Sequence, residues 1–144
     1  MKALVQRVKN ASVSINGTLY SQINHGLLVL LGVEKGDTED KIDWMVNKLV
    51  NLRIFENDER KMTLSVFDVK GEILLVSQFT LCADCKKGTR PSFDSAMSPK
   101  DAEKMYEKFI SCLKQKISVK TGVFGAMMDV SLINDGPVTV MVEK

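Results

Sequence analysis

The chain has 144 residues, of which 44% are hydrophobic and 26% are charged, and its formal net charge is +2. This length fits one domain with a packed core, and the composition excludes a disordered or fibrous protein. The small net charge excludes a uniformly basic nucleic-acid binder, so any contact with RNA has to come from a local patch. We therefore expect a single domain that covers residues 1–144.

The N-terminal residues do not resemble a targeting signal. Gln6 and Arg7 stand where a signal peptide needs an unbroken apolar stretch, and no run approaches the roughly 18 apolar residues of a membrane span. The cysteines are odd in number and lack the spacing of a disulfide framework, which indicates reduced thiols: Cys82, Cys85 and Cys112. We expect a soluble, cytoplasmic protein that makes no contact with a membrane.

The first half of the chain predicts strands and one helix. Strands are expected at 3–8, 12–15, 19–23 and 27–33, and later at 52–55, 61–66 and 72–78. Thr38 is placed to cap a helix whose apolar residues recur at helical spacing. Together they form one stripe, which predicts a face packed on the core: Ile42, Met45, Val46, Leu49 and Val50.

The second half begins with a loop rich in turn and basic residues, at 83–92. Ser98, Pro99 and Asp101 then predict the start of a second helix. Its apolar side consists of Ala102, Met105, Tyr106, Phe109 and Leu113. Strands follow at 119–122, 127–133 and 138–142, and the Asp-Gly pair before the last strand predicts a hairpin turn. Strands and helices do not alternate regularly, so we predict an α+β fold with an antiparallel or mixed, barrel-like sheet and two amphipathic helices.

Several familiar catalytic systems lack the residues that they need. The single histidine, His25, sits in an Asn-His-Gly turn at an expected hairpin tip, which disfavours a Ser/His/Asp or Cys/His system. Cys82 and Cys85 have the spacing of half a zinc site, but the other half is missing. No glycine-rich phosphate-binding motif is present. We therefore expect neither a metal nor a cofactor.

Two polar segments point to a function. The first, Ser77-Gln78-Phe79-Thr80-Leu81, crowds hydroxyls and an amide into the end of an apolar strand, where core packing would place Val or Ile. The second, at 134–139, reads Asn-Asp-Gly-Pro-Val-Thr. Taken alone, each also has a structural interpretation, as a strand edge with satisfied hydroxyls and as a plain hairpin.

Taken together, these segments resemble the D-aminoacyl-tRNA deacylases. The resemblance runs from Met1 to the last strand, with Cys82 standing where the family has a tyrosine. It also rests on three further segments in the same order: Arg53-Ile54-Phe55, Lys-Gly-Thr-Arg-Pro-Ser-Phe at 87–93, and Thr-Gly-Val-Phe-Gly at 121–125.

The resemblance implies a homodimer that needs no metal or cofactor. It would hydrolyse the ester between tRNA and a D-amino acid or glycine. In the family, the peptide that corresponds to Gly136-Pro137 is cis and is presented to the active site of the partner subunit. Such a rigid backbone wall would collide with an L side chain and leave a D side chain free.

The resemblance also assigns site residues. Ser77, Gln78, Phe79 and Thr80 would form the pocket that faces this wall, with backbone N–H groups of Phe79 and Thr80 as oxyanion donors. Without a nearby base, the Thr80 hydroxyl is a poor nucleophile, so we expect it to position the substrate while the ribose 2′-hydroxyl assists the attack.

Other residues have two interpretations each. Arg7 would brace the Gly136-Pro137 carbonyls or would be an exposed strand charge. Phe124 would stack on the terminal adenine or belong to the core. A basic group would contact acceptor-stem phosphates or form a solvated loop: Lys86, Lys87 and Arg90. The rival functions are a non-catalytic RNA-binding or ribosome-associated module and a non-stereospecific ester hydrolase.

Overall fold

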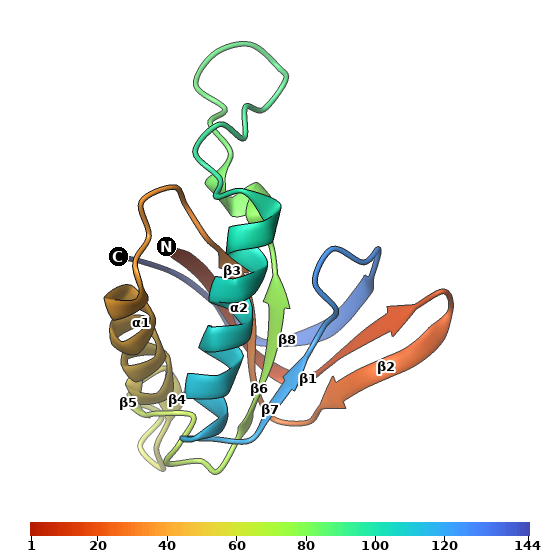
Figure 1. The fold of residues 1–144 in the computed structure, drawn as a ribbon. Helices are drawn as coiled ribbons and strands as arrows, with labels where there is room; N and C mark the ends of the chain where they lie inside the picture. Colours follow the sequence, from red (N-terminus) through yellow and green to blue (C-terminus); the bar gives the residue numbers. More distant parts are fainter.

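A computed structural model describes residues 1–144. The protein consists of a curved main sheet with two helices packed against it (Figure 1) and a small antiparallel sheet. The helices are α1 (Glu39–Asn51) and α2 (Pro99–Lys114), and a short 3-10 turn, η1, covers Phe79–Cys82. The strands are β1 (Lys2–Ile15), β2 (Thr18–Ile23), β3 (Gly26–Gly32), β4 (Phe55–Glu56), β5 (Met62–Leu64), β6 (Glu72–Ser77), β7 (Val119–Thr121) and β8 (Asp129–Glu143). The small antiparallel sheet is formed by β4 and β5. Neither helix is long and apolar enough to cross a membrane.

The main sheet is mixed and nearly closed. Its order is β2-β1-β3-β6-β7, and β8 pairs with β1 as well. The β3–β6 and β6–β7 pairs are parallel, and the other pairs in this sheet are antiparallel. The Ser21 hydroxyl of β2 donates a hydrogen bond to the carbonyl of Thr121 in β7 at 2.8 Å, which draws the two ends of the sheet together. The predicted α+β class and the mixed, barrel-like sheet are confirmed.

Both helices cover one face of the sheet, and their apolar stripes form the larger core with β1, β3 and β6. The buried residues of α1 are the five that the helical spacing predicts. In α2, four of the five predicted residues are buried, and Met105 packs partly buried against the same core. The other face forms a smaller core that the curl of β1 and β2 encloses, with Val8, Ala11, Val13, Leu74 and Val76 among its members.

The helix starts differ in how their caps work. Ser98 accepts a hydrogen bond from the Asp101 backbone N–H, and Pro99 occupies the first turn, as the sequence predicts. Thr38 does occupy the N-cap position of α1, but its side chain makes no capping hydrogen bond. The acidic first turn of α1, with Glu39 and Asp40, is the remaining favourable interaction with the helix dipole at that end.

The start of β1 is anchored by a buried carboxylate. Asp37 accepts hydrogen bonds from the Met1 amino group at 2.8 Å, from the Glu34 backbone N–H at 2.7 Å and from Lys41 at 2.9 Å. Burial alone would raise the pKa of Asp37, but these hydrogen bonds hold it below the usual value. The anchor fixes the strand that carries Arg7.

Three sequence predictions about strands are wrong in an instructive way. The residues 3–8 and 12–15 belong to one continuous strand, β1. The residues 127–133 and 138–142 do not form a hairpin around Asp135-Gly136, because both flanks belong to β8 and pair with β1. His25 does lie in a turn, but the flanking strands β2 and β3 pair with β1 rather than with each other.

Candidate functional site

The 77–80 segment leaves the sheet at the end of β6 and turns into η1. Ser77 is the last residue of β6, and Gln78 donates a hydrogen bond from Nε2 to the Thr80 hydroxyl oxygen at 2.5 Å. Phe79 is 56% exposed, and Thr80 is also exposed. The backbone N–H groups of Phe79 and Thr80 open the 3-10 turn, so they have no acceptor within it. The segment therefore presents an exposed hydroxyl that is bonded to a half-buried amide, and it has two backbone donors without acceptors in the turn.

The body of the protein holds this segment at several points. The Gln78 backbone N–H donates to the Leu31 carbonyl of β3 at 2.8 Å. A Cβ added at Gly32 would lie only 3.1 Å from the Gln78 carbonyl oxygen, so the close packing favours glycine there. From α2, the buried Tyr106 hydroxyl donates to the Leu75 carbonyl at 2.8 Å. Burial raises the pKa of Tyr106, and a hydrogen bond from the Ser77 backbone opposes the shift in part.

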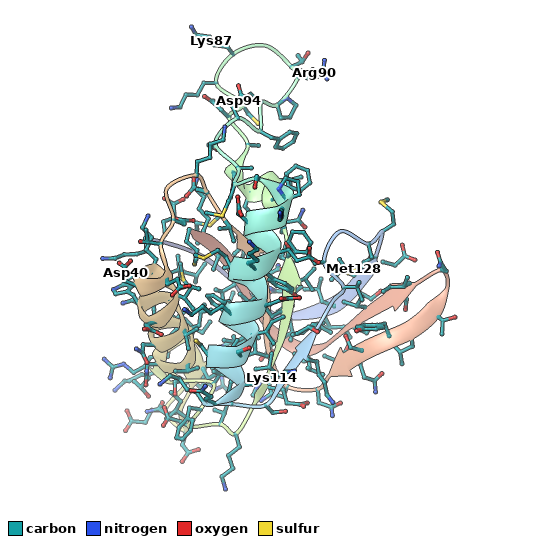
Figure 2. All side chains as sticks on the ribbon, in the orientation of Figure 1. Asp40, Lys87, Arg90, Asp94, Lys114 and Met128 are labelled. Carbon is teal, nitrogen blue, oxygen red and sulfur yellow. The ribbon has the colours of Figure 1, made fainter.

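An aromatic pair and a basic loop adjoin the 77–80 segment. The rings of Phe79 and Phe93 meet edge to face, with centroids 5.1 Å apart. Between them, the chain projects away from the body as a loop, closed at its base by the paired backbones of Asp84 and Ser92. Figure 2 shows two of its basic residues at the far end of the loop, and all three are exposed: Lys86, Lys87 and Arg90.

The 134–139 segment interrupts the pairing of β8 with β1. On β1, Gln6 pairs with Thr139 and Val8 pairs with Asn134. The single residue Arg7 thus faces the whole stretch 135–138, which leaves the ladder as an excursion. Gly136 and Pro137 are exposed at its centre, and the peptide bond between them is cis.

Arg7 holds one end of this excursion. Its Nε donates to the Asp135 carbonyl at 2.8 Å and its Nη1 to the Ile54 carbonyl at 2.7 Å. The carboxylates of Asp135 and Glu56 lie 3.4 and 3.5 Å from its guanidinium nitrogens. Because Arg7 is only 6% exposed, the alternative of an exposed strand charge is wrong. The carbonyl that Arg7 bonds in the excursion is that of Asp135, and not those of Gly136 and Pro137 that the resemblance implies. A buried, multiply bonded guanidinium fixes the backbone that it touches.

The two segments do not meet within one chain. Ser77 is in register with Leu31, which pairs with Ala3, whereas the excursion faces Arg7. Four residues along β1 span roughly 13 Å, and three strand spacings from β6 to β8 span about 14 Å. The two segments therefore do not line one site within a single chain.

His25 lies at the opposite end of the sheet from Ser77. Its neighbour Gly26 pairs with Glu72 at the start of β6. Five residues along the strand correspond to roughly 17 Å, so His25 is no base for the 77–80 segment of its own chain. The His25 ring meets Phe55 edge to face, and both line a cavity of about 220 Å³ with Arg7 and Asp135.

The remaining predicted residues are placed as follows. Phe124 is half-buried and packs near Tyr106, with ring centroids 5.9 Å apart, which supports its interpretation as a core residue. Cys82 is buried, Cys85 is exposed and Cys112 is half-buried; all three are free thiols. The structure contains no cluster of three or more His, Cys, Asp or Glu residues that could hold a metal ion.

The structure shows site contacts of four residues to which the sequence assigned no role in the site. Phe93 and Tyr106 adjoin the 77–80 segment, and Asn134 and Gln6 adjoin the excursion. The sequence predicts Tyr106 only as a core residue, because helical spacing does not indicate the hydrogen-bond partner of a buried hydroxyl. Phe93 stands in one of the resembling segments, which was the only available signal for it.

Comparison with known proteins assigns the family. The family model for D-Tyr-tRNA(Tyr) deacylase matches residues 4–143. The chain belongs to this family. A D-aminoacyl-tRNA deacylase from Aquifex aeolicus (strain VF5) is 54% identical over 145 residues, covering 100% of this chain and 98% of that protein. One from Desulfatibacillum aliphaticivorans is 56% identical, covering 100% and 99%.

A solved structure of a protein described by a different activity shows the same fold. It is named c-Myc DNA Unwinding Element Binding Protein and has a TM-score of 0.96 and 44% identity, covering 100% of this chain and 99% of that one. The suspected family is thus confirmed, and the shared fold extends over the full chain.

Replacing Arg7 tests how firmly the excursion is held. We expect Arg7→Met to lower the free energy of unfolding by about 1.5–3 kcal/mol, because two carbonyls lose a charged donor. Arg7→Lys should lose less, since it keeps the charge but not the forked geometry. Urea denaturation measures both variants against Lys9→Met, an exposed lysine on the same strand. Equal stability of Arg7→Met and Lys9→Met would contradict the bracing role.

Proposed function

We propose that the chain hydrolyses the ester that joins a D-amino acid, or glycine, to the 3′ end of tRNA and rejects L-aminoacyl-tRNA. The observation that carries this proposal is the braced, exposed backbone excursion at Gly136 and Pro137 in a member of the deacylase family. Because the proposed substrate is a tRNA, we also predict that the protein is cytoplasmic.

The proposed chemistry needs little from the side chains. An aminoacyl ester is already activated, so positioning and a few hydrogen bonds suffice to accelerate its hydrolysis. The backbone N–H groups of Phe79 and Thr80 would bind the developing oxyanion, and the ribose 2′-hydroxyl of the substrate would assist the attack. The Thr80 hydroxyl oxygen already accepts a hydrogen bond from the Gln78 amide. Because an amide N–H cannot remove the proton of the Thr80 hydroxyl, we assign Thr80 a positioning role.

Rejection of L-amino acids would come from the partner subunit. Gly136 and Pro137 of the second copy would stand against the α-carbon of the substrate, so that an L side chain collides with backbone while a D side chain points to solvent. Such rejection does not depend on which side chain arrives. Glycine has no side chain to exclude, which is why glycyl-tRNA is included as a substrate.

An apolar row supports a homodimer. Leu30, Leu4 and Met141 are aligned across β3, β1 and β8 on the face away from the helices, and Met141 is 44% exposed. The next row on this face holds the half-buried Gln6 and the exposed Thr139, beside the excursion. An apolar row with a polar rim is typical of a face that another protein covers. A second copy on this face would bring one excursion toward the other chain.

The RNA would be held without reading its sequence. Lys86, Lys87 and Arg90 lie on the projecting loop beyond η1, where they would meet acceptor-stem phosphates. Phe79 packs edge to face against Phe93, and it is the more exposed of these two aromatic side chains. Phe124 remains a candidate to contact the terminal adenine through its half-exposed side.

A second candidate function is nucleic-acid binding without catalysis. It is favoured by the solved structure at 44% identity, whose protein is described as binding a DNA unwinding element. The two candidates share a basic loop and differ in whether the ester is broken. A general ester hydrolase without stereospecificity is the third alternative, and the same assay separates it.

The deciding measurement is the stability of two charged tRNAs that differ only in chirality. We expect catalytic amounts of protein to hydrolyse D-Tyr-tRNA at least about 100-fold faster than L-Tyr-tRNA, a steric difference of a few kcal/mol. Buffer and a heat-inactivated sample serve as controls. If both esters survive equally with and without protein, the chain is a binding module. Comparable loss of both identifies a general hydrolase.

Substitution of Thr80 separates positioning from covalent catalysis. We expect Thr80→Ala to retain activity within about tenfold of the wild-type protein, because a lost hydrogen bond costs about 1 kcal/mol. Single-turnover hydrolysis of D-Tyr-tRNA gives the rate, and circular dichroism confirms the fold. A complete loss of activity with an intact fold would establish Thr80 as a nucleophile and remove the 2′-hydroxyl route.

Mixed dimers test whether one site draws on two chains. Gly136→Ala should block the site, because the added side chain would exclude the D substrate as well and its Cβ would lie 2.2 Å from the Val138 nitrogen. Phe79→Pro should disable the 77–80 segment, because proline lacks the backbone N–H that would bind the oxyanion. Each variant alone should be inactive. After co-refolding, we expect about a quarter of the wild-type rate, since half of the randomly mixed dimers hold one intact site of two. No recovery, or a monomer in sedimentation, contradicts the shared site.

A further inference from the structure

We propose that Asn134 is the positioning residue that fixes the far end of the Gly136-Pro137 excursion, and that it thereby sets how strictly the protein distinguishes D from L substrates. This inference rests on the function proposed above. Asn134 stands where β8 leaves its ladder with β1, and it is half-buried.

The Asn134 side chain pairs with one residue's backbone in both directions. Its Nδ2 donates to the Val138 carbonyl at 3.0 Å, and its Oδ1 accepts from the Val138 backbone N–H at 2.9 Å. The Val138 backbone N–H can only donate and the Val138 carbonyl can only accept. These partners therefore determine which atom of the Asn134 amide is the nitrogen and which is the oxygen. The side chain thus supplies the two hydrogen bonds that a neighbouring strand would give.

Val138 needs such a partner because the ladder offers none. Pairing with β1 stops at Asn134 opposite Val8 and resumes at Thr139 opposite Gln6. A backbone N–H and carbonyl left without partners in a half-buried position would be costly. Asn134 removes that cost from its own strand, β8, without using a residue of another strand.

A second shared contact orients the amide. The Thr139 hydroxyl oxygen accepts from Asn134 Nδ2 at 3.4 Å and from Gln6 Nε2 at 3.2 Å. Gln6 belongs to β1, so this contact ties the excursion to the strand beneath it. The three polar groups form a small network on the exposed face, next to the apolar row that we assign to the dimer.

The excursion is therefore held at both ends by different side chains. Arg7 bonds the Asp135 carbonyl, and Asn134 bonds Val138, with exposed Gly136 and Pro137 between them. Only Pro137 separates Gly136 from Val138, and a Cβ added at Gly136 would lie 2.2 Å from the Val138 nitrogen, so the two backbones lie close together. A displacement of the Val138 backbone must therefore move Gly136, which is the backbone that the substrate would meet.

The chemistry of this contact selects one residue type. A carboxylate accepts from the Val138 N–H but has no proton for its carbonyl, and a serine hydroxyl is too short to reach both groups. Asn134→Asp therefore keeps one of the two hydrogen bonds at constant volume, and Asn134→Ala removes both. The pair of variants separates the donor from the acceptor.

The experiment measures the ratio of hydrolysis rates for D-Tyr-tRNA and L-Tyr-tRNA, together with amide hydrogen exchange at Val138. For Asn134→Ala we expect the ratio to fall about tenfold and the Val138 amide to exchange at least about tenfold faster. For Asn134→Asp the amide should stay protected while the ratio still falls. Part of the fall should come from faster hydrolysis of the L ester, which a general loss of stability does not produce.

The control is Asn47→Asp on the exposed side of α1, which makes the same change of charge away from the excursion and should leave the ratio unchanged. A ratio within about twofold of the wild-type value in both Asn134 variants overturns the proposal. Should Asn134→Ala fail to fold, Asn134→Asp decides by the same criterion. If the wild-type protein itself does not distinguish the two esters, the proposed function fails, and this outcome is separate from a failure of Asn134.

Discussion

The contact between the Arg7 guanidinium and the Asp135 carbonyl is the interaction on which the rest of the site depends. β8 has no other strand partner in the chain, so where its ladder with β1 opens, only side chains hold the backbone. Arg7 is the residue of β1 left without a ladder partner on β8 at that point, and it also reaches the Ile54 carbonyl beyond α1. One buried cation thus joins the sheet, the segment after the helix and the excursion, and it has acceptors on each side that offset its burial.

The same topology separates the two polar segments. The C-terminal end of β6 leads into η1 at one end of the strands. The excursion of β8 is separated from β6 by β3 and β1, and it lies nearer the opposite end of the strands. A single chain cannot bring them together without breaking the ladders between them. In the proposed dimer this separation becomes useful, because each chain offers a polar pocket in one place and a backbone wall in another. Assembly would then be a condition for specificity and not merely for stability.

The features that the sequence predicts well are local, and the supports of the site are not among them. The stripe of α1 and the start of α2 at Ser98 follow from signals that act within a few residues. The Asp-Gly pair misleads for the same reason: it shows that the chain turns, but not which strand it pairs with afterwards. Parallel pairing of β3 with β6 joins residues about 45 positions apart, which no local pattern encodes. The segments at 77–81 and 134–139 stood out through resemblance, whereas the contacts of Tyr106 and Asn134 with the backbone did not, because both residues have ordinary interpretations where they stand.

The backbone wall of the proposed function imposes its own structural demand. A pocket that recognises one side chain tolerates small shifts, since its contacts are spread over many atoms, whereas exclusion by a few backbone atoms fails as soon as those atoms move. Side chains cannot be added to stiffen the wall, because they would also reject the D substrate. The stiffness has to come from hydrogen bonds made behind the wall to its own peptide groups. Arg7 at one end and Asn134 at the other meet this demand while they leave the exposed surface of Gly136 and Pro137 bare.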